Sequence, residues 1–370
     1  MGRGRRAGRR RAGRRGALPH RHERPAPRRR TPVNTLPAPA AGHRATRAAN
    51  GAAVLAEDLT RTYGTRQAVT GLDLTVPTGR TFGFLGPNGA GKSTTIGMLC
   101  TLLRPTSGRA LVAGYDVTRE PHEVRRRIGL VFQESTLDVD LTAMETLRFH
   151  ADLFGIPRRR RLDAIMDMLE LVELAERRHA PVRTFSGGMR RRLEIARGLL
   201  HTPRVLFLDE PTTGLDPQTR AAIWDHLRRL REERDVTVFL TTHQLEEAEH
   251  CDRIAIMDEG ELVADGTPAA LKAVVGSDLI TVRTADDPAA ALAVREHLGL
   301  EAETDTDGLR IRVADGAAWV PRICGALPLT VHSLTVTPPT LDDAFLHYTG
   351  RTIREADSKP AGPAIPAPRR

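Results

Sequence analysis

Apolar and polar positions follow two different periods along the chain, and the change of period divides it into regions. From Val54 to about residue 270, short apolar runs at 81–85, 204–208 and 236–240 each precede a loop and a helical pattern. Strands that alternate with helices in this way are typical of an α/β fold with a largely parallel sheet. Between residues 134 and 200 helical patterns dominate, and one predicted helical face gathers Leu162, Ile165, Leu169 and Val172. We therefore expect an α/β domain over residues 54–275 with a helical subdomain at about 135–200.

A second region follows at residues 276–349. Strand patterns at 278–283, 309–313 and 329–337 alternate with helical patterns at 288–298 and 317–326, and a weaker strand pattern lies near Glu303. This β-α-β-β-α-β order predicts a small α+β domain of ferredoxin-like type, closed by a helix at 339–348. Residues 350–370 are rich in Pro and Ala, which predicts a flexible tail.

Charge is distributed unevenly between the N-terminal tail and the rest of the chain. Residues 1–50 contain fifteen Arg and one acid, Glu23, so this tail carries +14 of a chain whose net charge is +9, and the remainder carries −5. Residues 1–53 have almost no large apolar side chains, which predicts disorder. Three interpretations of the tail stay open: binding of nucleic acid through phosphates, docking on anionic lipid, or a coding start chosen too far upstream, which we favour.

Two other classes of protein are disfavoured by composition. No apolar run approaches the ~18 residues that a membrane-spanning helix needs. The three cysteines, Cys100, Cys251 and Cys324, are far apart and odd in number, so they fit neither a disulfide framework nor a CxxC metal pair. A reducing cytosol is the simplest setting for them.

The segment GPNGAGKST at residues 86–94 matches the phosphate-binding pattern G-x-x-x-x-G-K-[ST], between a predicted strand and a predicted helix. Glycines let backbone N–H groups approach phosphate oxygens, and the positive end of the helix points at the same anion. Lys92 is one of only three lysines in the chain. We expect it to contact the β- and γ-phosphates and Ser93 to bind Mg²⁺. The predicted loop consists of Gly86, Pro87, Asn88, Gly89, Ala90, Gly91, Lys92, Ser93 and Thr94.

Two further segments carry candidate chemistry. The run VLFLDE at 205–210 is an apolar strand that ends in two acids, so Asp209 is placed to bind Mg²⁺ and Glu210 to accept a proton from attacking water. An ordinary strand followed by a helix-capping acid is the alternative. The run SGGMR begins a predicted helix and forms a second anion-ready helix start, made of Ser186, Gly187, Gly188 and Met189. Two such helix starts cannot serve one nucleotide unless the fold or a second copy brings them together.

In these motifs the chain resembles the nucleotide-binding subunit of an ABC transporter, over roughly residues 54–270. The phosphate loop corresponds to the family's Walker A motif, 205–210 to Walker B, 131–133 to the Q-loop, 185–189 to the signature, and 214–217 to the D-loop. The segments SGGMRRRLEIARG at 186–198 and EPTTGLDP at 210–217, with the closing PTLDDAFL at 339–346, resemble the daunorubicin-resistance type. Phe185 and Met189 replace the commoner Leu and Gln of the signature. His243 is present where some drug-resistance members carry Gln.

The resemblance implies an ATPase that uses ATP and Mg²⁺ and works as a head-to-tail homodimer. Walker A of one subunit and Ser186–Met189 of the other would enclose each ATP. Gln133 would be a third Mg²⁺ ligand beside Ser93 and Asp209, or would sense the attacking water. His243 would contact the γ-phosphate and orient Glu210, and Asp216 would report across the dimer interface. Tyr63 would stack on adenine, although a packing role for this aromatic stays open.

The same resemblance implies a transmembrane permease of the ABC-2 type as partner, export of a drug or antibiotic, and a peripheral position on the cytoplasmic face of the membrane. The alternative is a non-transport ABC ATPase that acts on nucleic acid or ribosomes. Only the basic tail favours that alternative, and the 94 residues from Lys92 to Ser186 leave no room for the long coiled coil of DNA-repair members. A catalytically dead regulatory subunit is disfavoured because Lys92, Asp209, Glu210 and His243 are all present.

Overall fold

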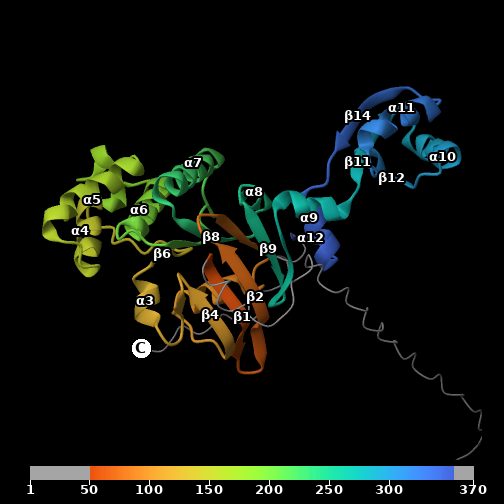
Figure 1. The fold of residues 1–370 in the computed structure, drawn as a ribbon. Coiled ribbons are helices and arrows are strands. Elements are labelled where there is room, and N and C mark those ends of the chain that lie inside the picture. The colour runs from red at the N-terminus through yellow and green to blue at the C-terminus, as the bar shows by residue number, and fades with distance from the viewer. Residues whose placement is uncertain (1–50, 354–370) are drawn as a thin grey trace, which may run out of the picture. The chain divides into compact units, whose positions relative to one another are not determined.

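The computed structural model describes residues 51–353, so most of the two predicted tails, 1–53 and 350–370, lies outside the described residues. In the described part, the prediction of a flexible tail is wrong for Arg351 and Ile353, because Arg351 is paired with Asp258 at 2.7 Å and Ile353 is buried. Three sheets organise these residues (Figure 1). The strand order is β2-β1-β4-β5 in the first sheet, β10-β9-β3-β8-β7-β6 in the second and β12-β13-β11-β14 in the third.

The six-stranded sheet carries the ends of strands from which the candidate residues project. It contains β3 (Thr81–Leu85), β6 (Ile128–Val131), β7 (Val205–Asp209), β8 (Thr237–Thr242), β9 (Arg253–Asp258) and β10 (Glu261–Gly266). All neighbouring pairs are parallel except β9 with β10. Every residue of β3, β7 and β8 is buried, as expected for strands covered on both faces. The predicted α/β fold with a largely parallel sheet is confirmed.

An antiparallel sheet precedes and flanks the phosphate loop. It consists of β1 (Ala52–Tyr63), β2 (Arg66–Pro77), β4 (Ser107–Val112) and β5 (Tyr115–Asp116). Strand β1 begins at Ala52, two residues before the start expected at Val54. The helices α2 (Lys92–Leu99) and α3 (Pro121–Arg125) connect this sheet with the strands of the parallel one.

The predicted helical subdomain contains α4 (Ala143–Leu153), α5 (Arg158–Leu171), two 3-10 turns, η1 (Ala175–Arg177) and η2 (Val182–Thr184), and α6 (Gly187–Leu199). A capping box between Thr142 and Glu145 begins α4. Of the predicted apolar face of α5, Ile165, Leu169 and Val172 are buried, but Leu162 is 56% exposed. The prediction is wrong for Leu162 because the core covers only the C-terminal half of α5, where the buried residues lie.

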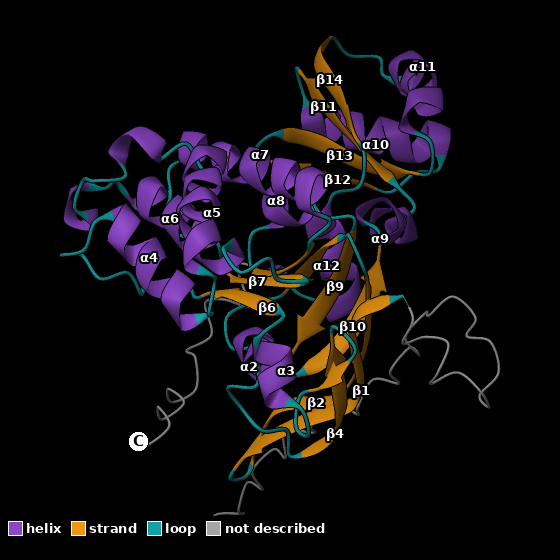
Figure 2. Cartoon of the chain, turned by 60° about the vertical axis from the view of Figure 1, so that its left-hand side comes forward, coloured by secondary structure: helices purple, strands orange, loops and turns teal. Residues whose placement is uncertain are grey.

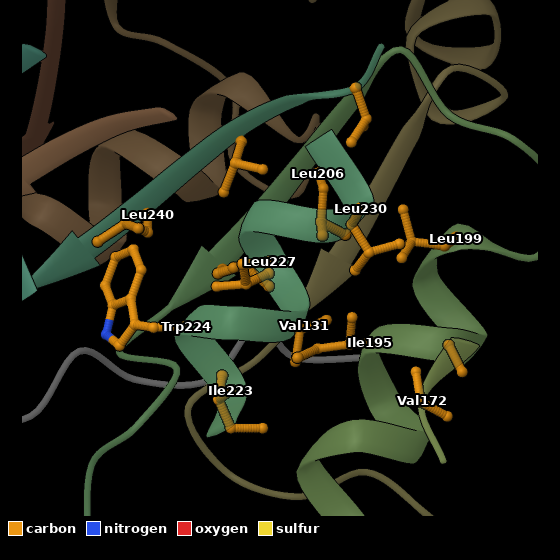
Figure 3. Close-up of a cluster of buried hydrophobic side chains, with 14 of the residues drawn as sticks. Val131, Val172, Ile195, Leu199, Leu206, Ile223, Trp224, Leu227, Leu230 and Leu240 are labelled. Carbon is orange, nitrogen blue, oxygen red and sulfur yellow. The ribbon is translucent and has the colours of Figure 1, made fainter. Parts of the chain in front are cut away.

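Helices α6 and α7 (Pro217–Arg234) lie against the strands that carry the candidate catalytic acids. Their apolar side chains meet those of β6, β7 and β8 in one buried cluster, shown in Figure 3 with the side chains of Ile195, Leu199, Trp224 and Leu227. The strands β6, β7 and β8, which are far apart in sequence, thereby share one core. Shorter helices follow at α8 (Leu245–Ala248) and α9 (Pro268–Val275).

The C-terminal sheet is made of β11 (Asp278–Thr284), β12 (Ala302–Asp305), β13 (Gly308–Val313) and β14 (Val331–Thr337). Helices α10 (Asp287–Leu298) and α11 (Gly316–Ala326) pack beside one another against it (Figure 2). A separate apolar core lies between these helices and the sheet. The elements follow in β-α-β-β-α-β order, and the classification as an independent ferredoxin-like domain stays a prediction.

The last described helix, α12 (Leu341–Thr349), does not share the core of the C-terminal sheet. It packs on α9 and β10, and Leu341, Ala344 and Phe345 join the buried cluster that contains Leu271. Among residues 51–353 no helix combines the length and the apolar content needed to cross a membrane.

Candidate active site

The glycine-rich loop joins the end of β3 to the start of α2, as its sequence predicts. Two of its glycines have no room for a side chain. A Cβ on Gly86 would lie 2.3 Å from the carbonyl oxygen of Met257, and one on Gly91 would lie 2.4 Å from that of Ala68. Gly91 also adopts φ 109° as it begins α2, a conformation that only glycine adopts readily. The loop backbone therefore turns tightly enough to leave N–H groups at the helix start for an anion.

Lys92 is buried, with only 4% of its surface exposed, and its ammonium group lies over this loop. Nζ donates to the carbonyl oxygens of Gly86 at 2.6 Å and Pro87 at 3.0 Å. It also lies 3.8 Å from Oε1 of Glu210. A buried ammonium between loop carbonyls and a carboxylate is well positioned to bind negatively charged phosphate oxygens.

Asp209 ends β7 next to the phosphate loop. Its Oδ1 accepts hydrogen bonds from Ser93 Oγ at 3.3 Å and from Thr241 Oγ1 at 2.5 Å. The Thr241 hydroxyl also accepts a hydrogen bond from the backbone N–H of Glu210 at 3.1 Å. Thr241 therefore orients both acids from the neighbouring strand β8, a role that the sequence analysis missed. Its place two residues before His243 was the available signal.

The donor set formed by Ser93 and Asp209 fits Mg²⁺. A hydroxyl and a carboxylate oxygen 3.3 Å apart are both hard oxygen ligands, and Mg²⁺ usually completes its octahedral shell with phosphates and water. Gln133 contacts Glu210 through its amide nitrogen in this structure. Its assignment as a third magnesium ligand stays a prediction.

Glu210 is the centre of the site and is 6% exposed. Its Oε2 accepts hydrogen bonds from Gln133 Nε2 at 3.0 Å and Thr213 Oγ1 at 3.2 Å, and its Oε1 lies 3.1 Å from Nδ1 of His243. The structure thus brings together the predicted residues from β7, β8 and the loop after β6. Thr213 is an additional contact that the sequence analysis did not single out, although it lies in the EPTTGLDP segment.

The environment of Glu210 suits a general base. Burial by itself raises the pKa of Glu210, but the hydrogen bond and charge of His243, the charge of Lys92 and the Thr213 hydroxyl leave that pKa below its ordinary value. The carboxylate is therefore ionised at neutral pH and can accept a proton from water. Glu210 also has a left-handed backbone with φ 46°, which is unusual for a residue other than glycine. Strain of this kind concentrates at functional sites.

The second anion-ready helix start is the beginning of α6. Ser186 caps it, since its Oγ accepts a hydrogen bond from the backbone N–H of Met189 at 3.2 Å. Gly188 packs against α7, and a Cβ at this position would lie 2.2 Å from the Thr219 side chain. Asp216 caps α7 in turn by accepting from the backbone N–H of Thr219 at 3.0 Å. The predicted signature residues and Asp216 therefore lie side by side at two capped helix starts.

These helix starts lie close to the candidate catalytic carboxylate of Glu210. A cavity of about 160 Å³ has Gln133, Gly187, Glu210 and Thr213 among its lining residues. The two predicted phosphate-binding elements begin two separate helices of the chain, α2 and α6.

Tyr63 lies at the end of β1, where the sequence predicts an aromatic that stacks on adenine. The guanidinium carbon of Arg61 lies 4.5 Å from the centroid of its ring. Arg61 is itself anchored, because Nη1 donates to the carbonyl oxygen of Arg104 at 2.8 Å. One face of the Tyr63 ring therefore already has a cationic partner, and stacking on adenine stays a prediction for the other face.

Comparisons with known proteins show the family to which the chain belongs. The family model described as ABC transporter matches residues 69–213. The daunorubicin resistance ATP-binding protein DrrA3 of Streptomyces coeruleorubidus is 43% identical over 312 residues, which cover 82% of this chain and 98% of that protein. The chain belongs to the ABC transporter ATP-binding proteins. It is an ATPase of that family.

Other members are similar over comparable lengths. The linearmycin resistance ATP-binding protein LnrL of Bacillus subtilis (strain 168) is 38% identical and covers 81% of this chain and 99% of its own length. Among solved structures, cbiO1 of Clostridium perfringens, part of the ABC transporter complex cbiONQ, has a TM-score of 0.57 at 28% identity, over 61% of this chain and 93% of that one. An ATP-binding cassette solved as a dimer in a post-hydrolysis state, bound to ADP and Pi, has a TM-score of 0.53 at 28% identity, over 58% of this chain and 98% of its own.

Proposed function

We propose that this ATPase is the energising subunit of an exporter of a drug or antibiotic and that it drives a separate ABC-2 type permease. The contacts of Glu210 carry the part of the proposal that concerns ATP hydrolysis. A buried, ionised carboxylate that lies within hydrogen-bonding distance of Gln133, Thr213 and His243, and 3.8 Å from Lys92, supports hydrolysis of a nucleotide whose phosphates lie at Lys92.

In this proposal Ser93 and Asp209 would hold Mg²⁺, which would supply positive charge to the phosphates of the nucleotide. Lys92 binds the same phosphates with its ammonium group. Glu210 accepts the proton of the attacking water through Oε2 or Oε1, and His243 and Gln133 orient that carboxylate. Thr241 keeps Asp209 and the Glu210 backbone in register from β8.

We further propose that the active form is a head-to-tail homodimer. Its support is the presence of two phosphate-ready helix starts, α2 and α6, on one chain. In such a dimer, α2 of one subunit and Ser186–Met189 of the other would face the same ATP. Closure around ATP and opening after hydrolysis would move the permease.

The drug-export part of the proposal rests on the relatives. DrrA3 is described as a daunorubicin resistance protein and LnrL as a linearmycin resistance protein. We assign the same class of cargo to the complex that contains this chain, and a peripheral position at the cytoplasmic face of the membrane beside the permease. Residues 51–370 carry a net charge of −5, which does not favour action on nucleic acid.

Mixing two inactive variants tests the head-to-tail arrangement. Lys92→Ala removes the phosphate-binding ammonium. Gly187→Glu places a carboxylate at the start of α6, where a Cβ would lie 3.4 Å from the Leu215 side chain, an ordinary contact distance. Each variant alone should be inactive. In a mixed dimer one site receives the intact Lys92 of one subunit and the intact Gly187 of the other.

An equimolar mixture should therefore recover up to about a quarter of the wild-type rate, since half of the dimers are mixed and each has one intact site of two. Gly187→Ala is the matched control and should stay active. A mixture that remains inactive while both variants still bind ATP or dimerise would contradict the proposal. Normal hydrolysis by Lys92→Ala alone would reject the phosphate-loop assignment.

A further inference from the structure

Helix α6 carries three buried charges on one face, and the mechanism above uses none of them. Arg191, Glu194 and Arg197 are spaced three residues apart and are 6%, 2% and 9% exposed. Charged side chains are almost never this buried unless they are paired. Their contacts therefore indicate what each charge does.

Arg191 uses all five of its N–H donors. Nε donates to the carbonyl oxygen of Pro211 at 2.7 Å, and Nη2 donates to those of Asp209 at 3.1 Å and Glu210 at 3.3 Å. Nη1 donates to the carbonyl oxygen of Phe132 at 2.5 Å and to Glu194 Oε2 at 3.1 Å. Four of the five acceptors are backbone carbonyls. They come from two segments of the chain, one next to Gln133 and one around Glu210, and these two residues are 77 positions apart in sequence.

Those two segments are the ones that deliver the candidate catalytic side chains. Phe132 directly precedes Gln133, and Asp209, Glu210 and Pro211 form the end of β7 and the turn after it. The carbonyls of Glu210 and Pro211 lie beyond the last residue of β7, where no sheet ladder continues to pair them. A buried guanidinium can pair such carbonyls, because its donors are arranged in a rigid planar fork.

Glu194 and Arg197 hold the other end of the same loop. Glu194 Oε1 accepts from the backbone N–H of Thr136 at 3.0 Å. Arg197 donates from Nη2 to Thr136 Oγ1 at 2.6 Å and from Nη1 to the Thr136 carbonyl oxygen at 3.2 Å. The loop from Phe132 to Thr136, which carries Gln133, is therefore tied to α6 at both ends.

We propose that Arg191 is a positioning residue for ATP hydrolysis. It fixes the carbonyl of Phe132, next to Gln133, and the backbone around Glu210 to one point on α6, and so sets the distance between the Gln133 and Glu210 side chains. The inference rests on the roles proposed above for Gln133 and Glu210. It requires the fork geometry of arginine and not only a positive charge beside Glu194. A lysine offers three donors from one atom and cannot reach four separated carbonyls as well as Glu194.

Arg191→Lys in the full-length chain is the decisive variant, since it keeps the charge opposite Glu194. The hydrolysis rate per bound ATP should fall on the order of 10- to 100-fold, the size of effect expected when catalytic groups are displaced by about 1 Å. The Kd for ATP and the number of ATP molecules bound per chain should stay near the wild-type values, because Lys92 and the phosphate loop are untouched. Fluorescent ATP titration and phosphate release measure the two quantities on the same preparation.

A second variant separates geometry from charge balance. Arg191→Leu combined with Glu194→Leu removes one positive and one negative buried charge, so the net charge of the cluster is unchanged and Arg197 keeps its hydrogen bonds to Thr136. This double variant should hydrolyse ATP as slowly as Arg191→Lys. Arg253→Lys is the matched control, because Arg253 also holds two acceptors, both oxygens of Asp265 at 2.8 Å, but lies on β9 away from α6. Its rate should stay within about twofold of wild type.

A wild-type rate for Arg191→Lys, or for the double variant, would overturn the proposal, because charge balance alone would then suffice. A fall in hydrolysis that is fully accounted for by fewer ATP molecules bound per chain would overturn it too. That result would mean that the variant unfolds, and not that Gln133 and Glu210 are displaced in a folded site. Glu210→Gln in the same assay keeps the two levels apart: if it hydrolyses ATP normally, the proposed role of Glu210 is wrong, whatever Arg191 does.

Discussion

Truncation of Phe345 tests how α12 is attached to the rest of the protein. Phe345 is completely buried, and Leu341 and Ala344 on the same helix are at most 1% exposed. The cluster that they join contains Leu271 of α9 and so belongs to the ATPase region and not to the core of the C-terminal sheet. Phe345→Ala would leave a cavity at this contact.

The size of the effect follows from burial. Removing a fully buried phenyl ring costs about 3–5 kcal/mol, which includes the lost transfer free energy and the cavity left behind. Phe345→Ala should therefore lower the free energy of unfolding by about 3–4 kcal/mol. The capping box between Thr340 and Asp343 and the ion pair of Asp343 with Arg312 at 3.1 Å stay intact, so the change isolates packing.

Urea unfolding followed by fluorescence and circular dichroism measures the difference, and Leu346→Ala is the control. Leu346 is the next residue on the same helix but is 40% exposed, so its truncation should cost no more than about 0.5 kcal/mol. If the two variants are destabilised equally, α12 is not packed on α9 in solution, and the reasoning from burial is refuted.

Three further predictions concern single buried groups. Burial raises the pKa of Glu247, so its ionised form costs stability in the folded state; the cost is absent below about pH 4.5, the ordinary value, and grows as pH rises through the raised pKa. Glu247→Gln should therefore raise the free energy of unfolding more at pH 8 than at pH 4, and an equal gain at both pH values would contradict this. Burial also raises the pKa of the Cys100 and Cys251 thiols. A thiol reagent at pH 8 should therefore modify only the exposed Cys324 quickly in the native protein, and all three cysteines after unfolding. Fast reaction of Cys251 in the native state would contradict this. Lys92→Ala should bind ATP at least tenfold more weakly by fluorescence titration, since it removes the buried ammonium from the phosphate loop, and unchanged affinity would contradict that placement.

Local sequence patterns were sufficient to predict the strand, the glycine-rich loop and the helix at residues 81–99 because this geometry is local. The glycines at 86 and 91, the strand before them and the helix after them all lie within residues 81–99, so the turn, the candidate anion site and the lysine can be predicted from one segment. The acids at 209 and 210 were predicted for a similar reason, since a buried strand ends directly before them. Their meeting with Gln133 and His243 follows once the strands are neighbours in a parallel sheet.

Contacts that depend on tertiary structure were not predictable in this way. The hydroxyls of Thr241 and Thr213 acquire their roles only through the position of the neighbouring acid, and a threonine carries no pattern of its own. Arg191 is one of three consecutive arginines, and nothing in that run shows which of them is buried. Leu162 fits the apolar period of its helix as well as Ile165 does, but the period cannot show where the neighbouring helices end.

The most direct test of the account is sedimentation of Glu210→Gln with ATP and Mg²⁺. The glutamine keeps the shape of the side chain but cannot accept the proton of water, so ATP binding and dimer closure should persist while hydrolysis falls about 10²- to 10⁴-fold. We predict a dimer that accumulates with ATP, and not with ADP, and that retains two uncleaved ATP molecules. A Glu210→Gln chain that hydrolyses ATP at the wild-type rate, or that binds ATP and remains a monomer, would contradict the account.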